Sequence, residues 1–188
     1  VTPAVISIVS EYLSLPDHNK SGKGMVAGGA LSPLIGALYL MPLDKLMEDL
    51  QATTGIRYQR YMDDYVIFAP TRHKLRKAIK QMYSVLDDLK VEVHPKKRFI
   101  GTTRRGFDFL GYWLEPHRPL TPSQVSLTRL IDRSRQLHER TASITRLRQY
   151  VFRWLQWHRS GLRGLTARSS NFKWVWGYVT NRLEINSS

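Results

Sequence analysis

The residues of this chain best suited to chemistry are two adjacent aspartates, Asp63 and Asp64, preceded by Tyr61 and Met62. Two neighbouring carboxylates on a tight turn repel each other unless a cation joins them. Hard divalent cations such as Mg²⁺ bind through one or two carboxylates together with substrate phosphates. The pair therefore fits metal-assisted phosphoryl transfer. Because an Asp-Asp pair alone is usually a solvated turn, the surrounding sequence has to decide between the two interpretations.

The sequence around the aspartates predicts a β-hairpin. Residues 56–61 alternate in polarity, residues 65–69 are rich in β-branched and aromatic side chains, and the short acidic segment 62–64 separates the two runs. A turn at the end of a hairpin is stiff enough to aim a carboxylate at a substrate.

Three helices are predicted in the first half of the chain. The first covers 4–13, with Thr2 as its N-cap and Pro3 at its first position. Apolar residues then recur at helical spacing over 31–50, which predicts one amphipathic helix of roughly 15–20 residues. A basic amphipathic helix follows over 72–90. Its apolar face comprises Leu75, Ile79, Met82, Val85, Leu86 and Leu89.

Two short strands are predicted after these helices, at 91–94 and 107–114. Several acidic residues have ordinary structural interpretations. We expect 87–88 to be a solvated helix end, Asp44 to be a helix-end cap or a solvated group, and Asp108 to be exposed on a strand.

The charge of the chain indicates a polyanionic partner. The net charge is +14, which favours nucleic acid. It is unevenly spread: residues 1–116 hold 16 basic and 12 acidic side chains, whereas residues 117–188 hold 13 and 3. Prolines at 116 and 119 interrupt regular structure at this division. We therefore expect two domains, 1–116 and 117–188.

Composition excludes several classes of protein. The chain has no cysteine, which excludes disulfide frameworks, Cys-ligated metal sites and thiol catalysis. Its longest apolar stretch, 30–42, is broken by Ser32 and Pro33 and is shorter than the about 20 residues that span a bilayer, so no membrane partner is expected. The start of the chain lacks the basic opening and cleavage site of a signal peptide.

The second half is predicted to be helical and rich in arginine. Two helices up to about Ser160 and a final Trp-rich helix over 170–183 carry apolar stripes beside cationic faces. The alternative is a merely solvated charged face, but acidic partners are nearly absent. We expect the tryptophans to be mainly core, with base stacking as the alternative. The arginines expected to contact a nucleic-acid backbone are Arg129, Arg133, Arg140, Arg146 and Arg153.

Four motifs follow one another along the chain. A Gly-rich stretch leads into Leu-Ser-Pro at 24–34, and Tyr-Met-Asp-Asp follows at 61–64. Pro-Lys-Lys begins the segment 95–101, and Phe-Asp-Phe-Leu-Gly lies within 106–112. In this order and spacing they resemble the reverse transcriptases of bacteria, particularly the group II intron-like and related retroelement enzymes. A weaker resemblance to a thumb extends over the rest of the chain.

The resemblance implies an α+β fold. A partial polymerase palm, an antiparallel sheet with packed helices, would occupy 1–116, and an all-helical thumb would occupy 117–188. It implies an RNA-directed DNA polymerase that transfers a nucleotide from a dNTP to a primer 3′-hydroxyl, with two Mg²⁺ ions, or Mn²⁺ in their place. Its partners would be dNTP and an RNA template with a DNA primer, and its location the bacterial cytoplasm.

The resemblance also implies roles for the hairpin residues. Asp63 would be a metal ligand and Asp64 its less direct partner. Tyr61 and Met62 would lie beside the primer terminus and the incoming nucleotide.

Further roles follow for the flanking motifs. The backbone of Gly28 and Gly29 would support the template–nucleotide pair. Lys97 matches the family's Pro-x-Lys lysine near the phosphates of the nucleotide, and Lys96 or Arg98 would replace it if the register slips by one residue.

The last motif would grip the primer strand. Phe109, Leu110, Gly111 and Tyr112 would form a hairpin against which the primer backbone lies. The alternative is that Phe107, Phe109 and Tyr112 are mainly core and that Gly111 is a bulge.

The chain departs from the family pattern. The family's Pro-Gln pair is replaced by residues 26–27, Val-Ala, and a frequent Asn is replaced by Ala37. A further catalytic Asp, on a strand before the first helix, has no counterpart upstream of Gly24. We therefore expect a C-terminal part of a longer enzyme, inactive by itself. The alternatives are a non-catalytic RNA-binding or maturase-like module and a structural domain with an accidental Asp-Asp turn.

Overall fold

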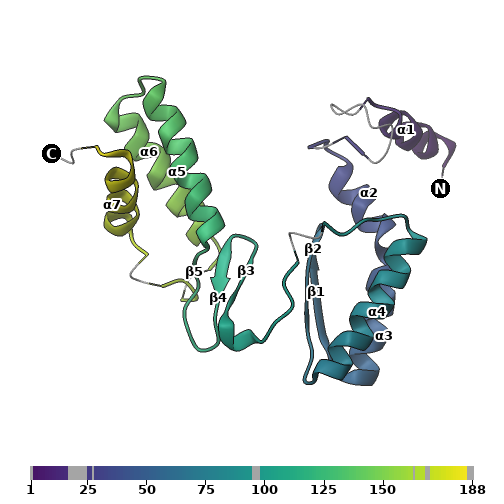
Figure 1. Ribbon diagram of the computed structural model, residues 1–188. Helices are drawn as coiled ribbons and strands as arrows, with labels where there is room; N and C mark the ends of the chain where they lie inside the picture. The colour runs from purple at the N-terminus through teal and green to yellow at the C-terminus, as the bar shows by residue number, and fades with distance from the viewer. Residues whose placement is uncertain are drawn as a thin grey trace. The chain divides into compact units, whose positions relative to one another are not determined.

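The structure is a computed structural model of the whole chain, which describes residues 2–16, 25–26, 28–94, 98–162, 164–167 and 170–185. The chain forms two compact units, 1–96 and 97–188 (Figure 1). Helices and small antiparallel sheets occur together, so the fold is α+β, as the sequence predicts.

The first unit contains four helices and one hairpin among its described residues. Helix α1 begins with Pro3 after Thr2, as predicted, although the Thr2 side chain makes no cap hydrogen bond. Neither α1 nor α2 has a buried residue. The elements are α1 (Pro3–Leu13), α2 (Ser32–Tyr39), α3 (Met41–Thr54), β1 (Arg57–Tyr61), β2 (Asp64–Phe68) and α4 (Arg72–Asp88).

The prediction of one helix over 31–50 is wrong, because the chain breaks at Leu40 between α2 and α3. The cause is Pro42, which lacks a backbone N–H and whose ring would clash with the carbonyl four residues earlier in a continuous helix. Pro42 is instead tolerated in the first turn of α3. The break lets α3 take its own direction against the hairpin.

The hairpin is confirmed and its turn is tighter than predicted. Strands β1 and β2 pair antiparallel, with Tyr61 opposite Asp64. The loop is therefore only Met62 and Asp63, and Asp64 begins β2. Met62 has a φ of 55°, in the left-handed region that such two-residue loops use.

Helices α3 and α4 lie side by side against one face of the hairpin (Figure 1). Their buried side chains meet those of Ile56 and Tyr58 from the β1 side of the sheet. The predicted apolar face of α4 is confirmed at Met82 and Leu86, and its other members are half-buried. The helical part of this core comprises Leu43, Met47, Leu50, Ala78, Met82 and Leu86.

The second unit combines a small sheet with three helices. The strand predicted at 91–94, which lies in the first unit, is not formed. In the second unit, residues 107–114 fold as a hairpin of two strands with Leu110 and Gly111 as its loop. A third short strand pairs with this hairpin. The elements are a 3₁₀ turn η2 (Thr103–Arg105), β3 (Phe107–Phe109), β4 (Tyr112–Leu114), β5 (Thr121–Pro122), α5 (Gln124–Glu139), α6 (Ile144–Arg159) and α7 (Phe172–Leu183).

The three helices α5, α6 and α7 share one core. Side chains at the starts of α6 and α7 cap them: Ser143 accepts from the Arg146 N–H and Asn171 from the Trp174 N–H. The prediction that the tryptophans are core is confirmed for Trp154 and Trp176. It is wrong for Trp157 and Trp174, which are 69% and 43% exposed. The core comprises Leu130, Ile131, Val151, Leu155, Val175 and Val179.

Within the described parts of the chain, none of the helices combines the length and the apolar character needed to cross a membrane.

Candidate active site

The predicted catalytic segment lies at the exposed end of the first unit's hairpin. Asp63 is in the loop and Asp64 begins β2, and both side chains are exposed. Tyr61 and Met62 are 57% and 50% exposed. The hairpin therefore brings all four predicted residues together and presents them to solvent.

Strand register places Tyr61 and Asp64 on the outer face of the hairpin. They are opposite each other in the ladder, so their side chains lie on the same face. Tyr58 and Arg60 point to the other face, where α3 and α4 pack. One face of the hairpin thus builds the core while the other carries an aromatic ring beside a carboxylate.

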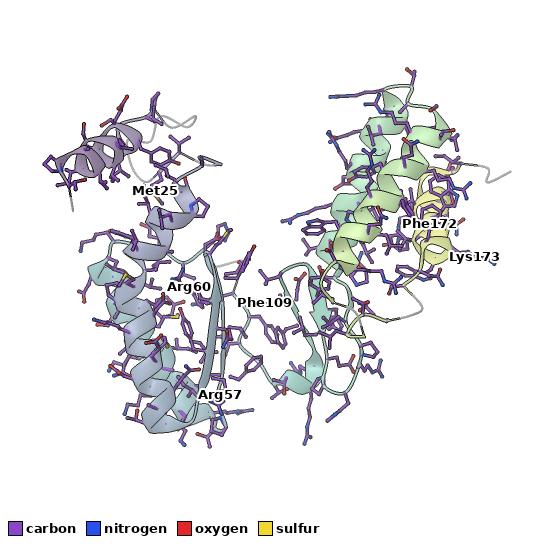
Figure 2. All side chains as sticks on the ribbon, turned by 180° about the vertical axis from the view of Figure 1, so that it is seen from behind. Met25, Arg57, Arg60, Phe109, Phe172 and Lys173 are labelled. Atoms are coloured by element: carbon purple, nitrogen blue, oxygen red, sulfur yellow. The ribbon has the colours of Figure 1, made fainter. Side chains whose placement is uncertain are left out.

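Arg60 ties the turn to helix α3, and Figure 2 shows it between the hairpin and that helix. Its Nε donates to Asp44 Oδ1 at 2.8 Å, and its Nη2 pairs with Asp44 Oδ2. Its Nη1 donates to the Met62 carbonyl at 2.8 Å. We call this arrangement the Asp44–Arg60 clamp. One guanidinium therefore fixes the carbonyl of the residue that precedes Asp63.

The interpretation of Asp44 as a cap or a solvated group is wrong. Besides Arg60, its Oδ1 accepts a hydrogen bond from the Tyr58 hydroxyl at 3.0 Å. The hydrogen bonds from Arg60 hold the pKa of Asp44 below its ordinary value, and burial beside Asp44 raises the pKa of Tyr58. The sequence shows only part of this arrangement: Tyr58 and Arg60 are two residues apart on one strand face, where a single acceptor reaches both, but it does not indicate that Asp44 is the acceptor.

The carboxylate pair has the donor chemistry of an Mg²⁺ site. Exposed aspartate oxygens suit this ion, which keeps its other positions for water and phosphate oxygens. No group of three or more His, Cys, Asp or Glu side chains that could hold a metal occurs within the described residues. Asp63 and Asp64 would thus hold a metal ion only together with ligands from elsewhere.

The Gly28–Gly29 segment lies at the start of α2. Gly28 has a φ of 77°, which favours glycine. A Cβ on Gly29 would lie 1.9 Å from the hydroxyl oxygen of Tyr12 in α1. That hydroxyl is 2.7 Å from Ser32 Oγ, which donates to the Val26 carbonyl at 2.8 Å. The glycines therefore allow α1 to approach α2 closely, and their contact with a template–nucleotide pair stays a prediction.

The predicted phosphate lysine cannot be placed. Lys97 and its alternative Lys96 lie outside the described residues, and Arg98 is described and exposed.

The predicted primer-gripping residues form the β3–β4 hairpin loop of the second unit. Leu110 and Gly111 have φ values of 52° and 82°, so both loop residues are left-handed and Gly111 is a turn residue rather than a bulge. Phe109 is half-buried and Leu110 is 38% exposed. The Gly111 carbonyl accepts from the Ser123 N–H at 2.9 Å, which ties this loop to the start of α5.

The five predicted backbone-contacting arginines are all exposed. Arg129 and Arg133 are four residues apart on α5, and Arg146 and Arg153 are seven apart on α6, so each pair shares a helix face. Arg133 is close enough to Tyr150 of α6 to oppose the rise that burial causes in that tyrosine's pKa. Arg140 caps the end of α5. We call Arg129, Arg133, Arg146 and Arg153 the seam arginines.

One buried residue was not anticipated from the sequence. His158 of α6 is 1% exposed, and its ring nitrogens have no hydrogen-bond partner among the described residues. The ring stacks between Tyr112 and Trp154, with centroid distances of 4.3 and 5.1 Å. Burial lowers its pKa to about 4.

Comparison with known families agrees with this geometry. The family model described as reverse transcriptase (RNA-dependent DNA polymerase) matches residues 5–114. This stretch is more than half of the 188 residues, so the chain belongs to the reverse transcriptase family. The match indicates an RNA-directed DNA polymerase, an enzyme class that binds template, primer and dNTP and uses divalent metal ions. A search of the curated proteins found no match.

Proposed function

We propose that this chain is the C-terminal palm and thumb portion of an RNA-directed DNA polymerase of the bacterial, group II intron-like type. The observation that carries the proposal is the pair of exposed carboxylates at a two-residue hairpin loop, in a chain of the reverse transcriptase family. The palm would comprise 1–116 and the thumb 117–188.

In this proposal Asp63 and Asp64 hold Mg²⁺, or Mn²⁺ in its place. When bound there, the metal would neutralise charge at the phosphates and lower the pKa of the attacking hydroxyl. Tyr61, which is exposed beside Asp64 on the outer face, would lie against the primer terminus or the incoming nucleotide with Met62. Lys97 would meet the phosphates of that nucleotide.

The Asp44–Arg60 clamp would act on the same turn. A hairpin loop bonded only to water would let the carboxylates move relative to the sheet. The bond from Arg60 Nη1 to the Met62 carbonyl removes this freedom. Arg60 is therefore a positioning residue for Asp63, since it reaches the turn through the backbone.

The second unit would hold the template–primer duplex. The seam arginines offer charge to phosphates along α5 and α6, and recognition would follow the shape and the 2′-hydroxyls of the duplex rather than its sequence. The β3–β4 loop at Leu110 and Gly111 would grip the primer strand.

We further propose that residues 1–188 do not extend a primer by themselves. Two adjacent carboxylates at one hairpin turn provide too few ligands for two metal ions, and no third acidic ligand joins them within the described residues. The third would come from a strand that precedes this sequence.

Primer extension tests the proposal. An RNA template with a DNA primer, dNTPs and Mg²⁺ is incubated with 1–188 and with a chain that carries the upstream segment of the same reading frame. We expect synthesis only from the longer chain. Robust synthesis by 1–188 would overturn the claim of incompleteness. A longer chain that binds RNA but never extends a primer would favour the alternative of a non-catalytic RNA-binding or maturase-like module.

A further inference from the structure

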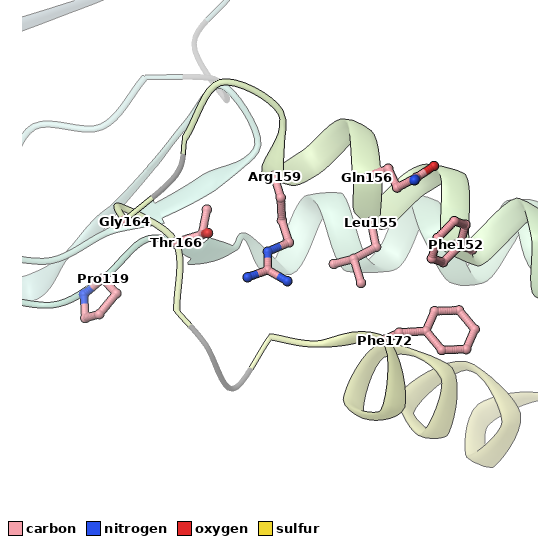
Figure 3. Close-up of a pocket in the computed structure, with 8 residues that line it drawn as sticks. All are labelled: Pro119, Phe152, Leu155, Gln156, Arg159, Gly164, Thr166 and Phe172. Atoms are coloured by element: carbon pink, nitrogen blue, oxygen red, sulfur yellow. The ribbon is translucent and has the colours of Figure 1, made fainter.

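A groove runs along the side of α6 that faces the start of α7, away from the seam arginines of α6. Its volume is about 850 Å³, and its walls come from Phe152 and Arg159 of α6, Thr166 of the following loop and Phe172 of α7 (Figure 3). The Arg159 side chain points into the groove (Figure 3). A smaller recess of about 350 Å³ shares both phenylalanines and extends to Arg148. We call the two together the α6–α7 groove.

Backbone hydrogen bonds hold the loop wall of this groove in place. The Leu120 N–H donates to the Leu165 carbonyl at 2.8 Å, and the Ala167 N–H donates to the Leu120 carbonyl at 2.9 Å. Thr166 is thereby paired with Leu120 in a parallel bridge. The loop wall of the groove is thus fixed in position by backbone hydrogen bonds within the second unit.

Aromatic rings with cations on either side line the α6–α7 groove. Phe152 and Phe172 meet edge to face with centroids 5.7 Å apart, and Phe152 is 47% exposed. The guanidinium carbon of Arg148 lies 5.6 Å from the centre of the Phe172 ring. Arg148 and Arg159 are three helical turns apart, a rise of about 16 Å. A ligand here would meet flat apolar surface between two positive charges.

The charge around the groove indicates an anionic ligand. Residues 140–183 contain eight arginines and one lysine and no aspartate or glutamate. Within the part of the chain that the structure describes, neither Arg148 nor Arg159 forms an ion pair. These two cations are therefore available to phosphates.

The aromatic rings of the groove favour single-stranded over double-stranded nucleic acid. In a duplex the bases are stacked on each other and their faces are inaccessible, whereas an unpaired base stacks readily on an aromatic side chain. Arg148, Phe152 and Arg159 share one stripe of α6 by their spacing of four and seven residues. Arg146 and Arg153 share another. One helix therefore carries two cationic faces, and one of them lines the aromatic groove.

We propose that the α6–α7 groove binds an unpaired segment of RNA, with a base stacked on Phe152 and the flanking phosphates on Arg148 and Arg159. This site is additional to the duplex-holding surface of the proposed function and does not depend on it. It would hold single-stranded RNA while the seam arginines hold the template–primer duplex.

Matched double variants on one helix test the site. The chain 1–188 is titrated into a fluorescent oligouridylate of about 12 nucleotides and, separately, into an RNA–DNA duplex. We expect R148Q/R159Q to weaken binding of the single strand about tenfold and to lower its salt slope by about 1.4, for two lost phosphate contacts. Binding of the duplex should change less than about twofold. The control R146Q/R153Q removes the same charge and should show the reverse preference.

A second pair of variants tests the stacking. Phe152→Leu keeps an apolar side chain and removes the ring, and should weaken single-strand binding about tenfold, while Phe152→Tyr should retain it. Thermal melting confirms that each variant folds. The proposal would be overturned if R148Q/R159Q and R146Q/R153Q weakened single-strand binding equally, or if Phe152→Leu left that affinity unchanged. Either result would indicate only diffuse electrostatic attraction between the protein and RNA. Loss of duplex binding alone would contradict the proposed thumb and leave this site intact.

Discussion

At the scale of single residues, the aspartates of the hairpin and the buried histidine of α6 show opposite uses of a titratable group. Asp63 and Asp64 are exposed, where charge costs little, and the proposal is that they hold a cation. His158 is enclosed between Tyr112 and Trp154 and acts as an uncharged ring in the core. The role proposed for the aspartates rests on a motif. The burial of His158 follows from spacing rather than from a motif, because it lies three residues after Leu155 and seven after Val151 on the apolar stripe of α6.

His158 makes stability depend on pH. In the folded state the pKa of His158 is about 4, below the ordinary 6.5. The stabilisation that the neutral, buried ring provides is therefore complete above pH 6.5 and is lost as the pH falls to about 4. We expect the free energy of unfolding to fall by up to about 3 kcal/mol over this window. His158→Phe should flatten the dependence, because it removes the buried imidazole. Urea unfolding between these two pH values measures the dependence in both chains, and an unchanged slope in His158→Phe would contradict the assignment.

At the scale of elements, the hairpin and α4 follow from local patterns, and the break between α2 and α3 follows from one proline that apolar periodicity alone overlooks. The Asp44–Arg60 clamp was missed for another reason. It joins residues sixteen apart through a fold that brings α3 against β1, and a pattern confined to a short window carries no such information. Residues 91–94 are not a strand in the structure, because strand propensity depends strongly on the surrounding packing and does not form a strand by itself.

The clamp predicts a specific pattern of destabilisation. Arg60→Met leaves the Asp44 carboxylate partly buried without its main partner, and we expect a loss of about 2 kcal/mol, reduced from the fully buried case by the partial exposure of both groups. Arg60→Met with Asp44→Leu should recover much of this loss, since no unpaired charge then remains. Urea unfolding measures the cycle. Additive losses in the double variant would show that the two side chains do not depend on each other.

At the scale of the whole molecule, charge and chemistry are divided along the chain. The net charge of +14 separates into a first half with 12 acidic residues and a second half with 3. The family match covers residues 5–114, where the carboxylate turn lies. Composition alone therefore predicts that the second half attracts a polyanion, and this stays a prediction; it could not predict the groove between α6 and α7.

This division predicts a steep salt dependence for duplex binding. If the second unit contacts about 5 phosphates, the logarithm of the association constant should fall with the logarithm of salt concentration at a slope near −4. R129Q/R133Q should reduce the magnitude of this slope by about 2. Fluorescence anisotropy over a salt series measures it, and an affinity that does not change with salt would refute electrostatic binding by the seam arginines.

The most direct test of the Tyr61–Asp64 turn as the metal-holding element of a reverse transcriptase is primer extension by the longer chain carrying Asp63→Asn. We expect a loss of at least about a hundredfold in the rate of extension, with binding of the RNA–DNA duplex retained. Asp88→Asn alters the pair of adjacent aspartates, Asp87 and Asp88, at the end of α4, and should leave the rate unchanged. Extension by Asp63→Asn at the rate of the unaltered chain would contradict the account.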